Sequence, residues 1–351
     1  MDTIILRDQR FLAHDPGAGH PDNPGRLQAV HDDLDAHPIP GTRTLTPRSA
    51  HRKELERVHD AAHVDRIRGT EGLERVQLDP DTATSAGSYA AALHGAGAVL
   101  QSTEAVVNRE ANGAFALVRP PGHHAESSTA MGFCLFNNVA VAAAHAIDEL
   151  ECKRVLILDP DVHHGNGTQH SFWQRRDVLY VSSHRFPFYP GTGAFDEVGT
   201  GAGEGYTVNL PLPAGMGNAD FYHLYRHVVE PVVNEYRPDL ILVSAGFDTW
   251  VNDPLGGMTM TADGYSALFG LFLRWAADHC PGRVVFALEG GYDPPGLVAG
   301  VRTALELTAG VREAPTEIED PPCEAAREIV RHARRLLSPY WHSLRGPAGC
   351  A

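Results

Sequence analysis

The stretch RVLILDPDVHHGNGTQ, residues 154–169, decides the expected fold of this chain. After Arg154 it begins with four apolar residues, which is typical of a strand buried on both faces of a parallel sheet. Two aspartates and two histidines follow between residues 159 and 164. Buried ionisable side chains are costly unless they pair or bind a ligand. The stretch therefore predicts a strand that carries a functional site at its carboxyl end.

Four further apolar runs resemble it: AFALV (114–118), VLYVSS (178–183), DLILVSAG (239–246) and RVVFALEGG (283–291). Helical patterns separate the runs, as in 136–150 and 263–279. This alternation predicts an α/β layer structure, with parallel strands covered by crossover helices. Polar clusters follow each run, and ligands gather beyond the carboxyl ends of parallel strands. We therefore expect these clusters to meet at one rim of the sheet.

The composition narrows the class of protein. With 351 residues, 43% hydrophobic and 21% charged, the chain is expected to be globular and not disordered. No apolar run is long enough for a membrane span, and the first ten residues lack a signal-peptide pattern, so we expect a cytoplasmic protein without a membrane partner. The net charge of −15 argues against nucleic acid and is compatible with a cationic substrate. The oligomeric state stays open.

The cysteines and the C-terminal region give two further expectations. The five cysteines are scattered and form no CxxC pair, which predicts reduced thiols and argues against a zinc ribbon or a disulfide framework. We expect one domain over residues 1–351, with a catalytic body over about 1–311. Residues 312–337 combine a Pro-rich acidic patch with an amphipathic helix pattern. This pattern predicts a helical appendage over about residues 312–351.

The run from Asp159 to His163 has the features of a metal site. Side chains two apart in extended chain share a face, so Asp159, Asp161 and His163 can point the same way. A carboxylate and an imidazole suit a divalent ion, and a catalytic zinc usually takes three protein ligands. Asp248, at the end of another predicted strand, is the best third ligand, whereas Asp253 resembles a turn residue. A single carboxylate in such a place is often only a helix cap or an ion-pair partner.

Three more side chains at predicted strand ends suit catalysis. His123 and His124 follow a Pro-Pro-Gly turn, and histidine has a pKa near that of a general base acting at neutral pH. The alternative interpretation is that both histidines are simply solvated side chains in a loop. Asp159 and Asn166 are candidate partners that would fix the imidazole tautomers. Tyr292 follows two glycines and could donate a hydrogen bond to a developing oxyanion, or it could simply be a packed aromatic.

Taken in order, the motifs RPPGHHAE, LDPDVHHGNGTQ, PGTG, SAGFD with DPLGG, and EGGY resemble those of the zinc-dependent histone deacetylase family. The likeness is closest to class II and bacterial members and covers about residues 1–311. It implies the arginase–deacetylase fold, an open and mostly parallel sheet of about eight strands with helices on both faces. It also implies a hydrolase that acts on amide bonds.

The resemblance implies a role for each motif residue. Asp161, His163 and Asp248 would hold one catalytic Zn²⁺. His124 would be the general base and then acid, His123 its electrostatic partner, and Tyr292 the group that polarises the carbonyl. Asp159 would pair with His123, and Asn166 with His124. A structural K⁺ would be held by backbone or side-chain oxygens of Asp159, Asp161, His163, Ser182 and Ser183.

The resemblance also implies a substrate channel. Phe133, beside Gly132, and Tyr189 would be its walls, and Asp81 a rim carboxylate that grips substrate amides. Relatives more often have phenylalanine where this chain has Tyr189. Leu255, at the gate, favours acyl-lysine in proteins or peptides over an acylated polyamine. His164 is expected to be structural.

Three alternatives remain open. The first is a deacetylase of acetylpolyamines or other small amides in the same family. The second is a two-manganese enzyme resembling the ureohydrolases, which the single DxDxH run and Asn166 disfavour. The third is a non-catalytic protein that binds acyl-lysine, which the full set of His123, His124 and Tyr292 disfavours.

Overall fold

An eight-stranded sheet forms the centre of the computed structural model, which describes residues 1–345. Its strands lie in the order β2-β1-β5-β10-β9-β6-β7-β8, and every pairing in the sheet is parallel. The strands are β1 (Thr3–Leu6), β2 (Thr42–Leu45), β5 (Ala114–Ala116), β6 (Val155–Asp159), β7 (Val178–Arg185), β8 (Thr207–Leu212), β9 (Leu240–Ala245) and β10 (Val284–Leu288).

The five runs singled out in the sequence are the strands β5, β6, β7, β9 and β10. All residues of β6, β9 and β10 are buried, which is why these strands are almost continuously apolar. The prediction of an open α/β fold with about eight parallel strands is confirmed. Strands β1, β2 and β8 were not predicted: β1 and β2 have four residues each, and Asn209 and Pro211 interrupt the apolar pattern of β8.

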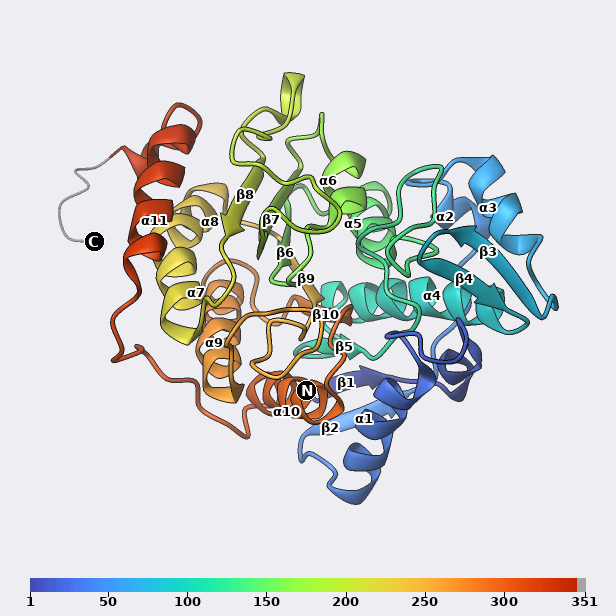
Figure 1. Ribbon diagram of the computed structural model, residues 1–351. Helices are drawn as coiled ribbons and strands as arrows, with labels where there is room; N and C mark the ends of the chain where they lie inside the picture. The colour runs from blue at the N-terminus through green and yellow to red at the C-terminus, as the bar shows by residue number, and fades with distance from the viewer. Residues whose placement is uncertain (346–351) are drawn as a thin grey trace.

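Helices cover the strands in two groups, one on either side of β9 and β10 (Figure 1). On one side α4 packs against α5, and on the other α9 packs against α10, which in turn packs on α1. The helices are α1 (Pro24–Ala36), α2 (Arg52–Leu55), α3 (Ala61–Arg68), α4 (Ser88–Val107), α5 (Asn138–Asp148), α6 (Asn166–Ser171), α7 (Asn218–Leu224), α8 (Glu230–Tyr236), α9 (Ala262–His279), α10 (Pro294–Thr308) and α11 (Glu324–Leu337).

A small antiparallel hairpin stands apart from the main sheet. Strands β3 (Arg75–Asp79) and β4 (Thr82–Ser85) pair with each other, with an irregular register at Gln77 and Asp79. Hydrogen bonds join this hairpin to residues 132 and 133, which lie between β5 and α5. The hairpin therefore borders the region where the polar strand ends were expected to meet.

The C-terminal segment is packed on the body and not detached from it. Helix α11 contacts α7 and β8 and buries its apolar stripe of Ala326, Ile329, Val330, Ala333 and Leu337. The Trp341 indole N–H donates to the carbonyl of Gly205 at 2.9 Å. The division into body and appendage stays a prediction, and its last residues, with Cys350, lie outside the described ones. Across residues 1–345 no helix has the length and apolarity that a bilayer crossing requires.

Candidate active site

The three residues proposed as metal ligands come together from two adjacent strands. Asp161 and His163 follow β6, and Asp248 follows β9, which pairs with β6. Their potential ligand atoms all lie within 4.8 Å of one another. His163 Nδ1 is 3.3 Å from Asp161 Oδ1 and 3.1 Å from Asp248 Oδ2. Residues far apart in the chain thus form one compact donor set.

Backbone groups fix both carboxylates. Asp161 Oδ2 accepts from Gly290 N at 2.9 Å, and Asp248 Oδ1 accepts from Val162 N at 2.8 Å. Gly290 is required for this close approach, because a Cβ there would lie 2.3 Å from Asp248 Oδ2. The main chain that follows β6 and β10 therefore holds both carboxylates in place.

The electrostatics of this donor set fit a divalent cation. Both carboxylates are fully buried. Burial and the negative charge of Asp161 raise the pKa of Asp248 to about 7. Burial alone would lower the pKa of His163, but the two carboxylates outweigh it and raise the pKa to about 9. A cation would relieve the repulsion between the carboxylates, and two oxygens with one imidazole nitrogen are ligands that zinc accepts.

A second cluster has the same composition. Glu54, Glu104 and His145, on α2, α4 and α5, also bring their potential ligand atoms within 4.8 Å. Here, however, Arg48 donates to Glu54 at 2.8 and 2.9 Å and to Glu104 at 2.7 Å. A guanidinium already supplies the positive charge, so this cluster is not the candidate metal site.

Two adjacent histidines next to the donor set have opposite electrostatics. His123 Nδ1 is 3.1 Å from Asp159 Oδ2, and the negative charges of Asp159 and Asp161 outweigh burial to raise the pKa of His123 to about 10. Burial and the positive charges of His123 and His163 hold the pKa of His124 well below its usual value. His123 is therefore cationic at neutral pH, and His124 is neutral.

The tautomer of His124 follows from its partner. Its Nδ1 lies 2.7 Å from Asn166 Oδ1, and Asn166 Nδ2 donates to Glu126 Oε1. Because the amide oxygen can only accept, Nδ1 carries the proton and Nε2 keeps its lone pair. The two expected pairs, His123 with Asp159 and His124 with Asn166, are both present in the structure.

Tyr292 lies near the same centre and is partly buried. Its ring lies edge-on to Phe133 at 5.9 Å, and the Arg26 guanidinium lies 5.1 Å from its centroid. Burial raises the pKa of the Tyr292 hydroxyl well above its usual value, so it remains a donor. Asp253 accepts from Tyr292 N at 2.6 Å and also from Leu255 N at 2.9 Å. Asp253 is a turn residue, as expected, and its turn is tied to Tyr292.

The predicted channel residues border this centre from four segments of the chain. Tyr189, 36% exposed, lies edge-on to the His124 ring at 5.1 Å. The ring of Phe133 packs edge-on against the ring of Tyr292. Asp81 Oδ1 accepts from Gly132 N at 3.1 Å, so the rim carboxylate is joined to the Phe133 segment. Leu255, partly buried, lies in the turn that Asp253 holds.

The residues proposed for potassium lie together, but their side chains have other partners. Asp159 pairs in register with Ser182 in the sheet. Ser182 Oγ is 2.8 Å from His184 Nδ1, and Ser183 Oγ is 3.0 Å from Tyr225 Oη. The potassium site stays a prediction. His164 contacts Thr192 Oγ1 at 2.7 Å and Gln169 Oε1 at 3.0 Å, a structural pattern.

Sequence reasoning missed two residues that hold the site. Glu289 is fully buried and accepts from Gly122 N at 2.6 Å and His123 N at 3.2 Å, so it fixes the histidine loop. Tyr180 Oη donates to Asp159 Oδ2 at 2.9 Å. A glutamate at the end of the apolar run VVFAL was a usable signal for Glu289. Tyr180 lies inside the apolar strand β7, and nothing in the local sequence indicated a role in the site.

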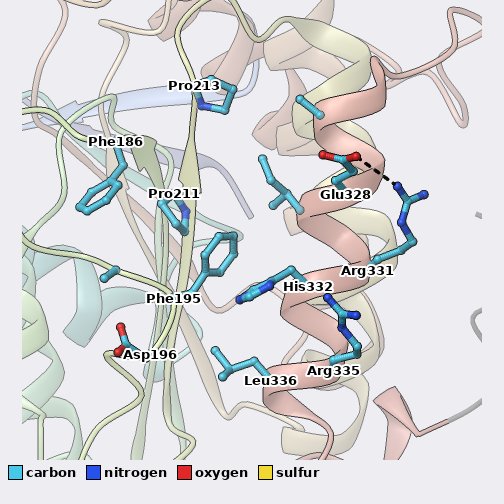
Figure 2. A pocket seen from close by; sticks show the side chains of 13 residues that line it. Phe186, Phe195, Asp196, Pro211, Pro213, Glu328, Arg331, His332, Arg335 and Leu336 are labelled. Carbon is cyan, nitrogen blue, oxygen red and sulfur yellow. Dashed lines mark ion pairs between the residues drawn. The ribbon is translucent and has the colours of Figure 1, made fainter.

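The large groove in Figure 2 is not this site. It has a volume of about 1060 Å³ and lies between α11 and the segments around β8. His332 points towards Phe195 across it, with ring centroids 4.4 Å apart. None of the candidate ligands or catalytic residues lines this groove.

Comparison with known proteins identifies the family. Residues 20–308 match the histone deacetylase domain. Over 97% of its length the chain is 39% identical to a probable deacetylase of Archaeoglobus fulgidus, covering 99% of that protein, and 38% identical to histone deacetylase 18 of Arabidopsis thaliana, covering 52% of it. The chain thus spans about half the length of that plant relative.

A solved structure agrees with this match. The crystal structure of the HDA15 HD domain superposes with a TM-score of 0.89 at 38% identity, covering 97% of this chain and 98% of that one. A domain match over most of the chain, an archaeal relative matched over nearly its full length and a shared fold point to the same assignment. The chain belongs to the histone deacetylase family.

Proposed function

We propose that this protein is a zinc-dependent amidohydrolase that removes acetyl or other acyl groups from the side-chain amine of lysine in proteins or peptides. One observation carries the proposal: a cluster of three potential metal ligands lies next to two histidines whose pKa values are shifted in opposite directions. Asp161, His163 and Asp248 form a buried ligand cluster, and His123 and His124 lie directly beside it. Membership of the histone deacetylase family supports the same chemistry.

Asp161, His163 and Asp248 would hold the ion. Bound there, Zn²⁺ would supply Lewis acidity, which polarises a carbonyl and makes water more acidic. The cluster supplies two carboxylates and one imidazole, and three protein ligands is the usual number in a catalytic zinc site.

The protein's own side chains move the protons. Neutral His124 would accept a proton at Nε2 from the attacking water, while its Nδ1–H stays bonded to Asn166. The same nitrogen would return the proton to the leaving amine as the amide C–N bond breaks. The products are a carboxylate and a free amine. Cationic His123 would stabilise the negative charge that develops on the substrate.

Tyr292 and the channel walls orient the substrate. The Tyr292 hydroxyl, held protonated by burial, would donate a hydrogen bond to the carbonyl oxygen as it gains charge. Phe133 and Tyr189 would flank the alkyl stem, because their rings border Tyr292 and His124. Leu255, without charge at the gate, favours a lysine side chain over a polyamine with a distal ammonium.

The decisive experiment compares substrates on one preparation. Purified protein with its zinc quantified would be assayed on acyl-lysine peptides of varied acyl length and on acetylputrescine. We expect turnover of the peptides and one zinc per chain. A strong preference for acetylputrescine would move the proposal to the small-amide deacetylases, and two metals per chain would favour the two-manganese alternative. A localisation in the cytoplasm remains a prediction.

A further inference from the structure

A tight turn supplies the Phe133 wall of the channel. Residues 131–134 form a β-turn that is closed by a hydrogen bond from Cys134 N to Met131 O at 2.9 Å. Both central residues have a left-handed backbone, with φ of 56° at Gly132 and 69° at Phe133. This is a turn of type I′, in which the second central position normally holds glycine. Phe133 is therefore in a conformation that its own backbone disfavours.

The first central residue has to be small for a second reason. A Cβ added at Gly132 would lie 2.3 Å from Cδ2 of His124. The turn therefore rests directly on the imidazole that is proposed as general base, while the Phe133 ring meets Tyr292. A shift of this turn would change the channel wall and the packing of His124 together.

Two residues of the β3–β4 hairpin hold the turn in place. Phe133 N donates to Thr82 Oγ1 at 3.0 Å, and Gly132 N donates to Asp81 Oδ1 at 3.1 Å. The Thr82 hydroxyl in turn donates to the same Asp81 oxygen at 2.8 Å. Thr82 is 1% exposed, so water cannot easily replace it. The backbone N–H groups of Gly132 and Phe133 thus both donate to side chains of the adjacent residues Asp81 and Thr82.

The surroundings of this pair reinforce it. His20 Nε2 donates to the Asp81 carbonyl at 3.0 Å, and its ring lies edge-on to Phe133 at 4.5 Å. The carboxylate oxygen Oδ1 of Asp81 already accepts from Gly132 N and from the Thr82 hydroxyl. Only its other oxygen is left to meet a substrate.

We propose that Thr82 is a positioning residue for substrate binding: its hydroxyl links Asp81 to Phe133 and holds the channel wall in its left-handed conformation. The proposal rests on the proposed function for its kinetic consequence, but the tether itself can be tested without turnover. Loss of the hydroxyl should loosen the turn, widen the range of Phe133 positions and weaken the grip on an acyl-lysine stem. Metal binding should not change, because Thr82 contacts no candidate ligand in the hydrogen-bond network described.

The chain offers a matched set of variants. Thr82→Val removes the hydroxyl at nearly constant shape, and Thr82→Ser keeps it. Thr84→Val makes the same change two residues along β4, where the buried Thr84 hydroxyl finds no hydrogen-bond partner among residues 1–345. A single cooperative unfolding transition in urea for each variant would show that all three fold.

The first readout is amide hydrogen exchange of the peptide containing Phe133, followed by mass spectrometry. We expect Thr82→Val to exchange faster there, and Thr82→Ser and Thr84→Val to match the unchanged protein. The second is the affinity of the zinc-containing protein for a hydroxamate with an unbranched alkyl stem, expected to fall about tenfold in Thr82→Val only, the effect of losing one hydrogen bond. With an acyl-lysine peptide the loss should appear in KM more than in kcat.

The outcomes separate the two proposals. Unchanged exchange in Thr82→Val, or faster exchange with unchanged hydroxamate affinity, would overturn the role of Thr82. Equal losses in Thr84→Val would also overturn it, because the effect would then not depend on the tether. If no acyl-lysine peptide is turned over while exchange and hydroxamate affinity both respond as expected, the positioning role stands and the proposed substrate is wrong.

Discussion

Two clusters in this molecule each contain two carboxylates and one imidazole, and they behave in opposite ways. In the first, Asp161, His163 and Asp248 face one another, no arginine among residues 1–345 donates a hydrogen bond to them, and the pKa of Asp248 is raised to about 7. In the second, hydrogen bonds from Arg48 outweigh burial and lower the pKa of Glu54. The ligand types alone therefore do not make a metal site. What matters is whether a permanently charged guanidinium already occupies the cluster, because an imidazole can give up its proton when a metal binds and a guanidinium cannot.

The largest expected effect comes from removing a ligand of the first cluster. Asp248→Ala should abolish stoichiometric zinc and lower kcat/KM by about a thousandfold or more, because the metal chemistry is lost. Zinc would be measured by elemental analysis alongside peptide turnover. Glu104→Ala, the corresponding change in the second cluster, should leave both values unchanged. If Glu104→Ala lost the zinc and Asp248→Ala kept it, the two clusters would have been assigned the wrong way round.

The next effect separates chemistry from metal binding. His124→Ala and Tyr292→Phe should each lower kcat by about a hundredfold to ten-thousandfold, since one removes the base and the other an oxyanion donor. Both should retain one zinc per chain, because neither side chain belongs to the donor set. Loss of zinc in His124→Ala would show that this histidine is a ligand and not the base.

Removing the cation of the second cluster tests the comparison directly. Arg48→Met should lower the free energy of unfolding by about 1–3 kcal/mol, less than for a fully buried ion pair because Arg48 is partly exposed. Urea denaturation would measure it. Added zinc should then stabilise Arg48→Met more than the unchanged protein. An equal response to zinc in both would mean that Arg48 does not keep cations out of this cluster.

His59 shows what burial does without a carboxylate. Its Nε2 accepts from Asn137 N and its Nδ1 lies 2.9 Å from the Glu126 carbonyl, so the ring is held neutral. Burial and the charge of His63 lower its pKa from 6.5 to about 3. The folded state therefore binds this proton less readily than the unfolded chain. The stability that neutral His59 provides is complete above about pH 6.5 and is lost as the pH falls towards 3.

The size of this effect can be measured. Between pH 6.5 and pH 5 the loss should reach about 2 kcal/mol, from 1.36 kcal/mol per pH unit. His59→Gln should flatten this part of the stability curve, whereas the exposed histidine change His37→Gln should not. Urea denaturation at constant zinc would record both. An unchanged slope in His59→Gln would show that another group causes the acid instability.

The sequence by itself determined the central strands and the order of the site motifs. Apolar runs such as VLIL and LILV leave few alternatives to buried parallel strands, and polar residues at their ends converge because parallel strands end at the same rim. The donor set Asp161, His163 and Asp248 could be named for that reason, and the structure brings it together.

Only the tertiary structure decided which charges face which. It placed Arg48 inside the Glu54–Glu104–His145 cluster. It also made adjacent His123 and His124 electrostatically opposite, because His123 pairs with Asp159 and His124 with Asn166. It also joined Thr82 to Phe133 across 51 residues of chain. Electrostatic energies and hydrogen bonds depend on distances of a few ångströms between residues remote in sequence, and no local pattern in the sequence records those distances.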